Sequence, residues 1–132
     1  MDVTVTQEQA KVPVTVFHVS GQLNVSTYEA LQQRARQAYA AGARDLVIDL
    51  SRTTYISSAG IRSISAIFRM VRSSSPAESP EVMEKGLKEG TFKSPHLKLS
   101  GATGSVAEVL KLAGVDMFLE IHENIQDALA SF

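Results

Sequence analysis

The sequence contains no cysteine, and only three of its 132 residues are histidines, namely His18, His96 and His122. The absence of cysteine excludes a disulfide framework and catalysis by a thiol. The three histidines lack the close spacing that zinc ligands usually have. We therefore expect neither a metal site nor another cofactor.

An excess of charge of one sign is also missing, since 13 Lys and Arg residues face 14 Asp and Glu residues, giving a formal net charge of −1. Such a chain has no general electrostatic attraction to nucleic acid or to an anionic membrane, so we expect no nucleic-acid partner. No apolar run approaches the roughly twenty residues that span a bilayer. The first residues lack the basic start and apolar core of a secretory signal. These absences predict a cytoplasmic protein without membrane insertion.

The hydrophobic content of 44% and the charged content of 20% are typical of a globular chain. At this length they predict one domain over residues 1–132. Residues 73–95 differ from the rest, because they hold three of the four prolines and five serines. This composition predicts a flexible insertion within the domain. Such an insertion is either a surface loop or a partner-binding or regulatory arm.

Strand patterns occur in five places along the chain. Residues 3–6 alternate apolar with polar, and residues 14–19 are β-branched and apolar, which predicts an antiparallel pair of strands. Residues 46–50 form a nearly continuous apolar run, typical of a central strand that is covered on both faces. Residues 97–99 and 118–121 predict two further short strands.

Helix patterns alternate with these strands. Residues 26–29 (Ser-Thr-Tyr-Glu) read as a capping box that starts a helix, and Gly42 is placed to end it. An apolar stripe predicts a second helix from Ser58 to about Arg72. A second capping box at residues 105–108 predicts a third helix, and the closing residues 124–132 predict a fourth.

This order of elements predicts the α/β class. Strands that alternate with helices form right-handed crossovers onto a parallel sheet, and the opening pair adds an antiparallel edge. We therefore expect a mixed, mostly parallel sheet of four to five strands, covered by about four helices.

The most informative segment is residues 55–62 (Tyr-Ile-Ser-Ser-Ala-Gly-Ile-Arg), which joins the central strand to the second helix. Ligands of α/β proteins usually bind at this end of the sheet. The unpaired amides and partial positive charge of a helix start would stabilise a phosphate on Ser57 or Ser58. Arg62, one turn after Ser58, would add a charge-assisted hydrogen bond. The alternative is that Ser57 or Ser58 only caps the helix.

Two parts of the chain resemble a known family. Residues 19–26 (Val-Ser-Gly-Gln-Leu-Asn-Val-Ser) resemble its strand, glycine, leucine and helix-cap segment. Residues 45–51 and 55–61 resemble its central strand and phosphorylation loop. Both are similar to STAS domains, the sulfate-transporter and anti-sigma-factor-antagonist family, and particularly to single-domain bacterial anti-sigma factor antagonists. The resemblance covers nearly the whole chain except residues 73–95, and it implies the STAS-like version of the fold predicted above.

The resemblance implies a phosphoprotein that regulates transcription by partner switching. In that family the unphosphorylated antagonist binds an anti-sigma factor that is also a serine kinase, which frees the sigma factor. Phosphorylation of one serine ends the binding, and a cognate phosphatase restores it. The family's acceptor serine lies two residues before a glycine, so Gly60 assigns it to Ser58, with Ser57 as the second choice.

The sequence departs from the family pattern at three positions. Ser57 stands where the family has an aspartate before the acceptor, Ala59 where it has a hydroxyl residue, and Asn24 where it has an acidic residue. Fewer carboxylates near Ser58 reduce repulsion of a phosphate dianion, but they also remove groups that a kinase or its magnesium would use for alignment. The departures make phosphorylation of Ser58 a weaker inference than the fold.

A partner surface follows from the same segments. We expect the segment 21–26, the turn 57–62 and a polar outer face of the second helix, with Ser63, Ser65 and Arg69, to form it. The protein itself is expected to be a monomer or a weak dimer. The predicted contact residues are Gly21, Gln22, Asn24, Ser26, Ser57, Ala59, Gly60, Arg62, Ser63 and Arg69.

Two other functions compete with this interpretation. An enzyme would use Ser58 as a nucleophile, but a hydrolase elbow has glycine on both sides of the serine, and here only Gly60 is present. Its base would be His18, inside a predicted strand, or His96 or His122, so we expect no enzyme. The second alternative is a non-switching STAS subunit of a transporter or a lipid-transport complex.

Overall fold

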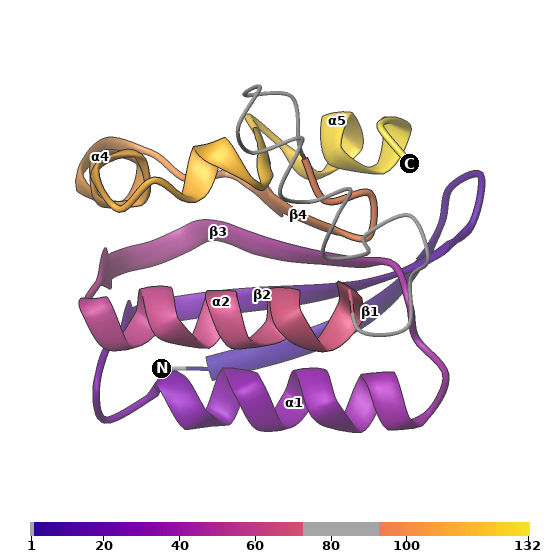
Figure 1. The fold of residues 1–132 in the computed structure, drawn as a ribbon, viewed down its shortest axis with the longest axis horizontal. Helices are drawn as coiled ribbons and strands as arrows, with labels where there is room; N and C mark the ends of the chain where they lie inside the picture. Colours follow the sequence, from indigo (N-terminus) through magenta and orange to yellow (C-terminus); the bar gives the residue numbers. More distant parts are fainter. Residues whose placement is uncertain (1, 73–92) are drawn as a thin grey trace.

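The structure is a computed structural model that describes residues 2–72 and 93–132. Its five strands form one sheet in the order β1-β2-β3-β4-β5 (Figure 1). β1 pairs antiparallel with β2, and all other neighbours are parallel, which confirms the predicted mixed, mostly parallel sheet. The strands are β1 (Asp2–Gln9), β2 (Pro13–Leu23), β3 (Leu46–Ile56), β4 (Leu97–Ser100) and β5 (Glu120–His122).

The described residues contain four α-helices, as expected, and one short 3-10 helix, η2. In Figure 1 α1 and α2 lie alongside each other; α1 follows β2 in the chain, and α2 follows β3. None of these helices is long and apolar enough to cross a membrane. The helices are α1 (Tyr28–Ala40), α2 (Ser58–Arg72), α4 (Gly104–Leu112), η2 (Val115–Met117) and α5 (Ile125–Ala130).

The two faces of the sheet bury different apolar clusters. Phe17 and Val19 of β2 belong to a large cluster shared with α1, α2 and α4. Val14 and Val16 alternate with them and belong to a small cluster that also contains Ala128 of α5. β3 contributes to both clusters, which explains the continuous apolar run in its sequence.

Both predicted capping boxes are wrong. Thr27, and not Ser26, precedes α1, and the Thr27 hydroxyl serves a tight turn: it accepts from the Asn24 amide at 2.9 Å and donates to the Gln22 carbonyl at 2.8 Å. α4 begins at Gly104, before Ser105, so the predicted box lies inside the helix. For α1, the connection from β2 decides where the helix begins.

The last strand is also shifted, from the predicted 118–121 to Glu120–His122. The amides of Phe118 and Leu119 bond to the Val115 carbonyl and continue the turn of η2. The Phe118 ring packs against Phe68 of α2 at a centroid distance of 5.0 Å. Phe118, which the sequence pattern assigned to a strand, therefore packs against α2 and lies outside β5.

The predicted flexible insertion at 73–95 lies outside the described residues, apart from residues 93–95. Within that end, Ser94 is fully buried. Its amide donates to the Phe118 carbonyl at 2.9 Å, and its hydroxyl accepts from the Leu97 amide at 3.2 Å. Ser94 therefore belongs to the packed start of β4. That the whole chain is one domain stays a prediction.

Candidate functional site

Two segments that are distant in sequence meet at one end of the sheet. β2 and β3 are parallel, and Leu23 lies opposite Ile56 where both strands end. The Ser57 amide donates to the Leu23 carbonyl at 3.0 Å and so joins the start of the β3–α2 turn to the end of β2. In Figure 1 the connections β2–α1 and β3–α2 lie together at the left end of the sheet. The segment 21–26 and the turn 57–62 therefore form one continuous surface at this end of the sheet, which we call the edge below.

Gly60 makes this close approach possible. A Cβ atom on Gly60 would lie 2.7 Å from the Leu23 carbonyl oxygen and 2.7 Å from Cγ1 of Ile56. Side-chain carbon atoms do not approach other atoms so closely in folded proteins. The first turn of α2 rests directly on the end of β2 because residue 60 has no side chain.

The two serines of the turn have different surroundings. Ser57 is half-buried before the helix; its hydroxyl accepts from the Gly60 amide at 3.5 Å, and its carbonyl accepts from the Ile61 amide at 3.0 Å. The capping interpretation is therefore confirmed for Ser57, through a long hydrogen bond. Ser58 is exposed, and its hydroxyl has no hydrogen-bond partner within residues 2–72 and 93–132. The Ser58 hydroxyl is therefore accessible from solvent.

The predicted contact residues divide into two groups by exposure. Ala59, Gly60 and Ser63 are buried, and Ser63 is 0% exposed, with its hydroxyl donating to the Gly60 carbonyl at 2.7 Å. The prediction that Ser63 belongs to a polar outer face is wrong, because helical spacing places it on the same stripe as Gly60 and Ile67. The remaining residues are exposed or partly exposed: Gly21, Gln22, Asn24, Ser26, Ser57, Arg62 and Arg69.

Two large side chains at this end of the sheet were not among the predicted contact residues. Val25, in the turn after β2, is 73% exposed, and Tyr55, opposite Gln22 near the end of β3, is 48% exposed. They add apolar area to a surface that is otherwise lined by polar groups. The sequence signal for Val25 was its position between Asn24 and Ser26, where no core pattern requires an apolar residue; Tyr55, between Thr54 and Ile56, gave no such signal.

The three histidines lie elsewhere and pair with carboxylates. His18 Nδ1 lies 2.8 Å from Oδ2 of Asp49, His96 Nδ1 lies 2.8 Å from Oδ1 of Asp45, and His122 Nε2 lies 3.1 Å from Oε1 of Glu120. Among the described residues, none of the three histidines hydrogen-bonds to Ser58. In the described ranges, no three acidic or histidine side chains gather as a metal site.

Comparison with known proteins adds independent information. The family model described as the STAS domain matches residues 4–75 of the chain. A search among curated proteins found no match to this chain.

Three solved structures share the fold. An anti-sigma factor antagonist from Mycobacterium paratuberculosis is 23% identical with a TM-score of 0.70, over 98% of this chain and 93% of that one. A STAS domain protein from Planctomyces limnophilus is 18% identical with a TM-score of 0.69, over 96% and 93%. The phosphorylated form of the Bacillus cell fate determinant SpoIIAA is 11% identical with a TM-score of 0.61, over 96% of each chain.

Proposed function

Because the chain belongs to the STAS domain family, we propose that it is an anti-sigma factor antagonist that acts by partner switching. Its partner is an anti-sigma factor serine kinase, which binds the edge formed by the segment 21–26, the turn 57–62 and the exposed side of α2. The chain catalyses no reaction itself and works in the cytoplasm. Phosphorylation of Ser58 releases the partner, and a phosphatase reverses it.

The observation that carries this proposal is the difference between the two neighbouring serines. Ser57 supplies the hydrogen bond to the helix start, while the Ser58 hydroxyl is exposed and unengaged in the described structure. A kinase can therefore modify Ser58 without breaking a contact of the fold. The exposed Val25 and Tyr55 side chains supply apolar area for a partner at the same edge.

The same geometry supports a switch in binding with no change in folding. A phosphate on Ser58 would add a charge of about −1.5 to −2 at the first turn of α2. The amides of that turn and the exposed Arg62 would stabilise the phosphate in the free protein. A partner packed on this edge would have to desolvate the phosphate, so the complex is destabilised while the domain stays folded.

The experiment is incubation with candidate serine kinases of the same organism and ATP, followed by mapping of the modified residue by mass spectrometry. We expect phosphate on Ser58, loss of it in Ser58→Ala, and loss of kinase binding in Ser58→Asp. Ser105→Ala is the matched control, because Ser105 is also an exposed serine in the first turn of a helix.

Three outcomes would contradict the proposal. Modification of Ser57 in place of Ser58 would show that Ser57 is the phosphate acceptor. Absence of any modification, with a stable kinase complex, would leave an unswitched binding module. Co-purification with a transporter or lipid-transport complex and with no kinase would overturn the role in sigma-factor control.

A further inference from the structure

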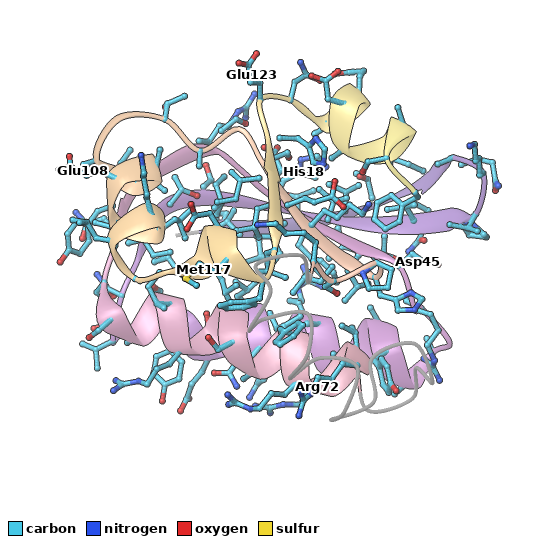
Figure 2. All side chains as sticks on the ribbon, turned by 45° about the horizontal axis from the view of Figure 1, so that its top comes forward. His18, Asp45, Arg72, Glu108, Met117 and Glu123 are labelled. Carbon is cyan, nitrogen blue, oxygen red and sulfur yellow. The ribbon has the colours of Figure 1, made fainter. Side chains whose placement is uncertain are left out.

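A second polar site lies on the other face of the sheet, and nothing in the proposed function uses it. A pocket of about 500 Å³ opens there over β1, β2 and β3. His18 lines it and lies on the same side as α5, away from α1 and α2 (Figure 2). We propose that this sheet-face pocket binds a small molecule that carries both a carboxylate and an ammonium group, such as a free amino acid.

The strand register arranges the lining residues in two rows. Asp2, Ser20 and Arg52 are opposite one another on β1, β2 and β3, and Thr4, His18 and Asp49 form the neighbouring row. Adjacent strands are about 4.8 Å apart, so the backbones of Asp2 and Arg52 are separated by about 10 Å. One acidic and one basic side chain therefore flank the pocket on either side of a serine.

A bulge in β3 places Arg52 in this pocket. The register shifts between His18 and Ser20, so that Asp49 faces His18 while Arg52 faces Ser20. Strict alternation would turn residue 52 to the opposite face from residue 49, and the extra residue brings both to the same side. Two residues of one strand now direct charged groups at one cavity.

Neighbouring contacts hold the bulge in place. The Ser51 amide donates to Oδ1 of Asp49 at 3.0 Å, which satisfies an amide near the irregular step in the register. Gly101, which follows β4 at a φ of 77°, packs so closely that a Cβ atom on it would lie 2.8 Å from Cβ of Ser51. The position of Arg52 is therefore built into the sheet.

The side chains of His18 and Asp49, which line the pocket, already have hydrogen-bond partners within the protein. Because a carboxylate can only accept, His18 Nδ1 carries a proton and donates to Oδ2 of Asp49 at 2.8 Å. In the neutral ring Nε2 then accepts from the Thr6 hydroxyl, which lies 2.9 Å away. Both oxygens of Asp49 are thus engaged, so neither Asp49 nor His18 is the primary ligand for an ion.

The groups that remain available are complementary to a zwitterion. Within residues 2–72 and 93–132, the carboxylate of Asp2, the guanidinium of Arg52 and the hydroxyls of Thr4 and Ser20 have no hydrogen-bond or ion-pair partner. Arg52 matches a carboxylate, and Asp2 matches an ammonium group. A simple anion would leave Asp2 unpaired, and a simple cation would leave Arg52 unpaired. Both side chains are exposed and hydrated in the free protein, and a ligand with both charges pairs with both at once.

The test is a titration of the full chain with a panel of proteinogenic amino acids, followed by two-dimensional amide NMR and calorimetry. Lactate, ethylamine and inorganic phosphate are the comparison ligands. We expect at least one amino acid to bind, with shifts concentrated at Ser20, Asp49 and Arg52. The variants Arg52→Gln and Asp2→Asn should each weaken binding about tenfold, as expected for loss of one charge-assisted contact.

The matched control is Arg36→Gln, because Arg36 is an exposed arginine of α1 outside the pocket. It should leave amino-acid binding unchanged, and unfolding curves of all variants should coincide with that of the parent. Absence of binding by every amino acid would overturn the proposal. Binding of lactate, ethylamine or phosphate with the same affinity would contradict the inference that the ligand must carry both charges. The titration uses no kinase, so its outcome is independent of the proposed partner switching.

Discussion

At the scale of single residues, the turn 57–62 separates a structural serine from an accessible one. Ser57 is bonded to the helix start, and Ser58 is not. Ser57→Ala should lower the free energy of unfolding by about 0.5 kcal/mol, the low end for a helix cap, because the hydrogen bond is long. Ser58→Ala should change it by less than about 0.5 kcal/mol. Urea unfolding of both variants measures the difference, and a larger loss in Ser58→Ala would contradict the assignment.

Gly60 permits a sharper prediction at the same scale. Gly60→Ala places a carbon where the Leu23 carbonyl and the Ile56 side chain leave 2.7 Å. The helix start must then move away from β2, and we expect a loss of about 1–3 kcal/mol, as for other overpacked sites. Thermal unfolding measures this loss. Ser65→Ala is the control, because Ser65 is a partly exposed position of the same helix where alanine should not destabilise.

At the scale of elements, α2 has an apolar stripe toward the sheet and arginines on the opposite side. Arg62 and Arg69 are both exposed, and they lie on the side of the helix that we assign to the partner. Arg62→Glu or Arg69→Glu should weaken binding of the kinase about tenfold by reversing one charge at the interface. Lys111→Glu, an exposed reversal on α4, should leave binding unchanged. Calorimetry with the purified kinase decides, and unchanged affinity in both arginine variants would move the interface elsewhere.

The C-terminal element depends on one buried lysine. Lys98 of β4 is 2% exposed, and its ammonium donates to Glu120 at 3.0 Å and to the Ser131 carbonyl at 2.9 Å. The ammonium also lies 4.6 Å from the centroid of the Phe132 ring. Lys98→Ala should therefore release the last residues from the sheet, at a cost of about 2 kcal/mol.

Hydrogen exchange of the α5 amides measures this release, and we expect faster exchange in α5 than in α1. Lys98→Met is the control for volume, since it retains the apolar packing of the side chain without its hydrogen bonds. Slow exchange in α5 of Lys98→Ala would show that the apolar contacts of Ala128 hold the helix without the lysine.

At the scale of the whole molecule, all five strands of the described residues share one sheet, and the larger apolar cluster joins it to three α-helices and η2. We therefore expect one cooperative unfolding transition, in which near-ultraviolet and far-ultraviolet signals change together in urea. Two separated transitions would contradict the prediction of a single domain over residues 1–132.

The sequence by itself determined the order and type of most elements. The apolar run of β3, the helical stripe of α2 and the turn 57–62 between them are local patterns, and local patterns depend on residues within a few positions of one another. α2 has the predicted bounds, but β3 continues past the predicted 46–50 to Ile56, so that only Ser57 separates the strand from the helix. The choice of Ser58 as acceptor came from the resemblance to the STAS family and stays a prediction.

Only the tertiary structure decided which side chains are buried, where the ends of helices fall and what lies across the strands. Ser63 is polar, yet its position on the stripe of α2 buries it. α1 starts later than predicted because the Thr27 hydroxyl is hydrogen-bonded within the turn that follows β2. The sheet-face pocket depends on strand register and on a bulge, which bring His18 to Asp49 and Arg52 to Ser20. Register and bulges are set by packing between segments far apart in sequence, so no local pattern encodes them.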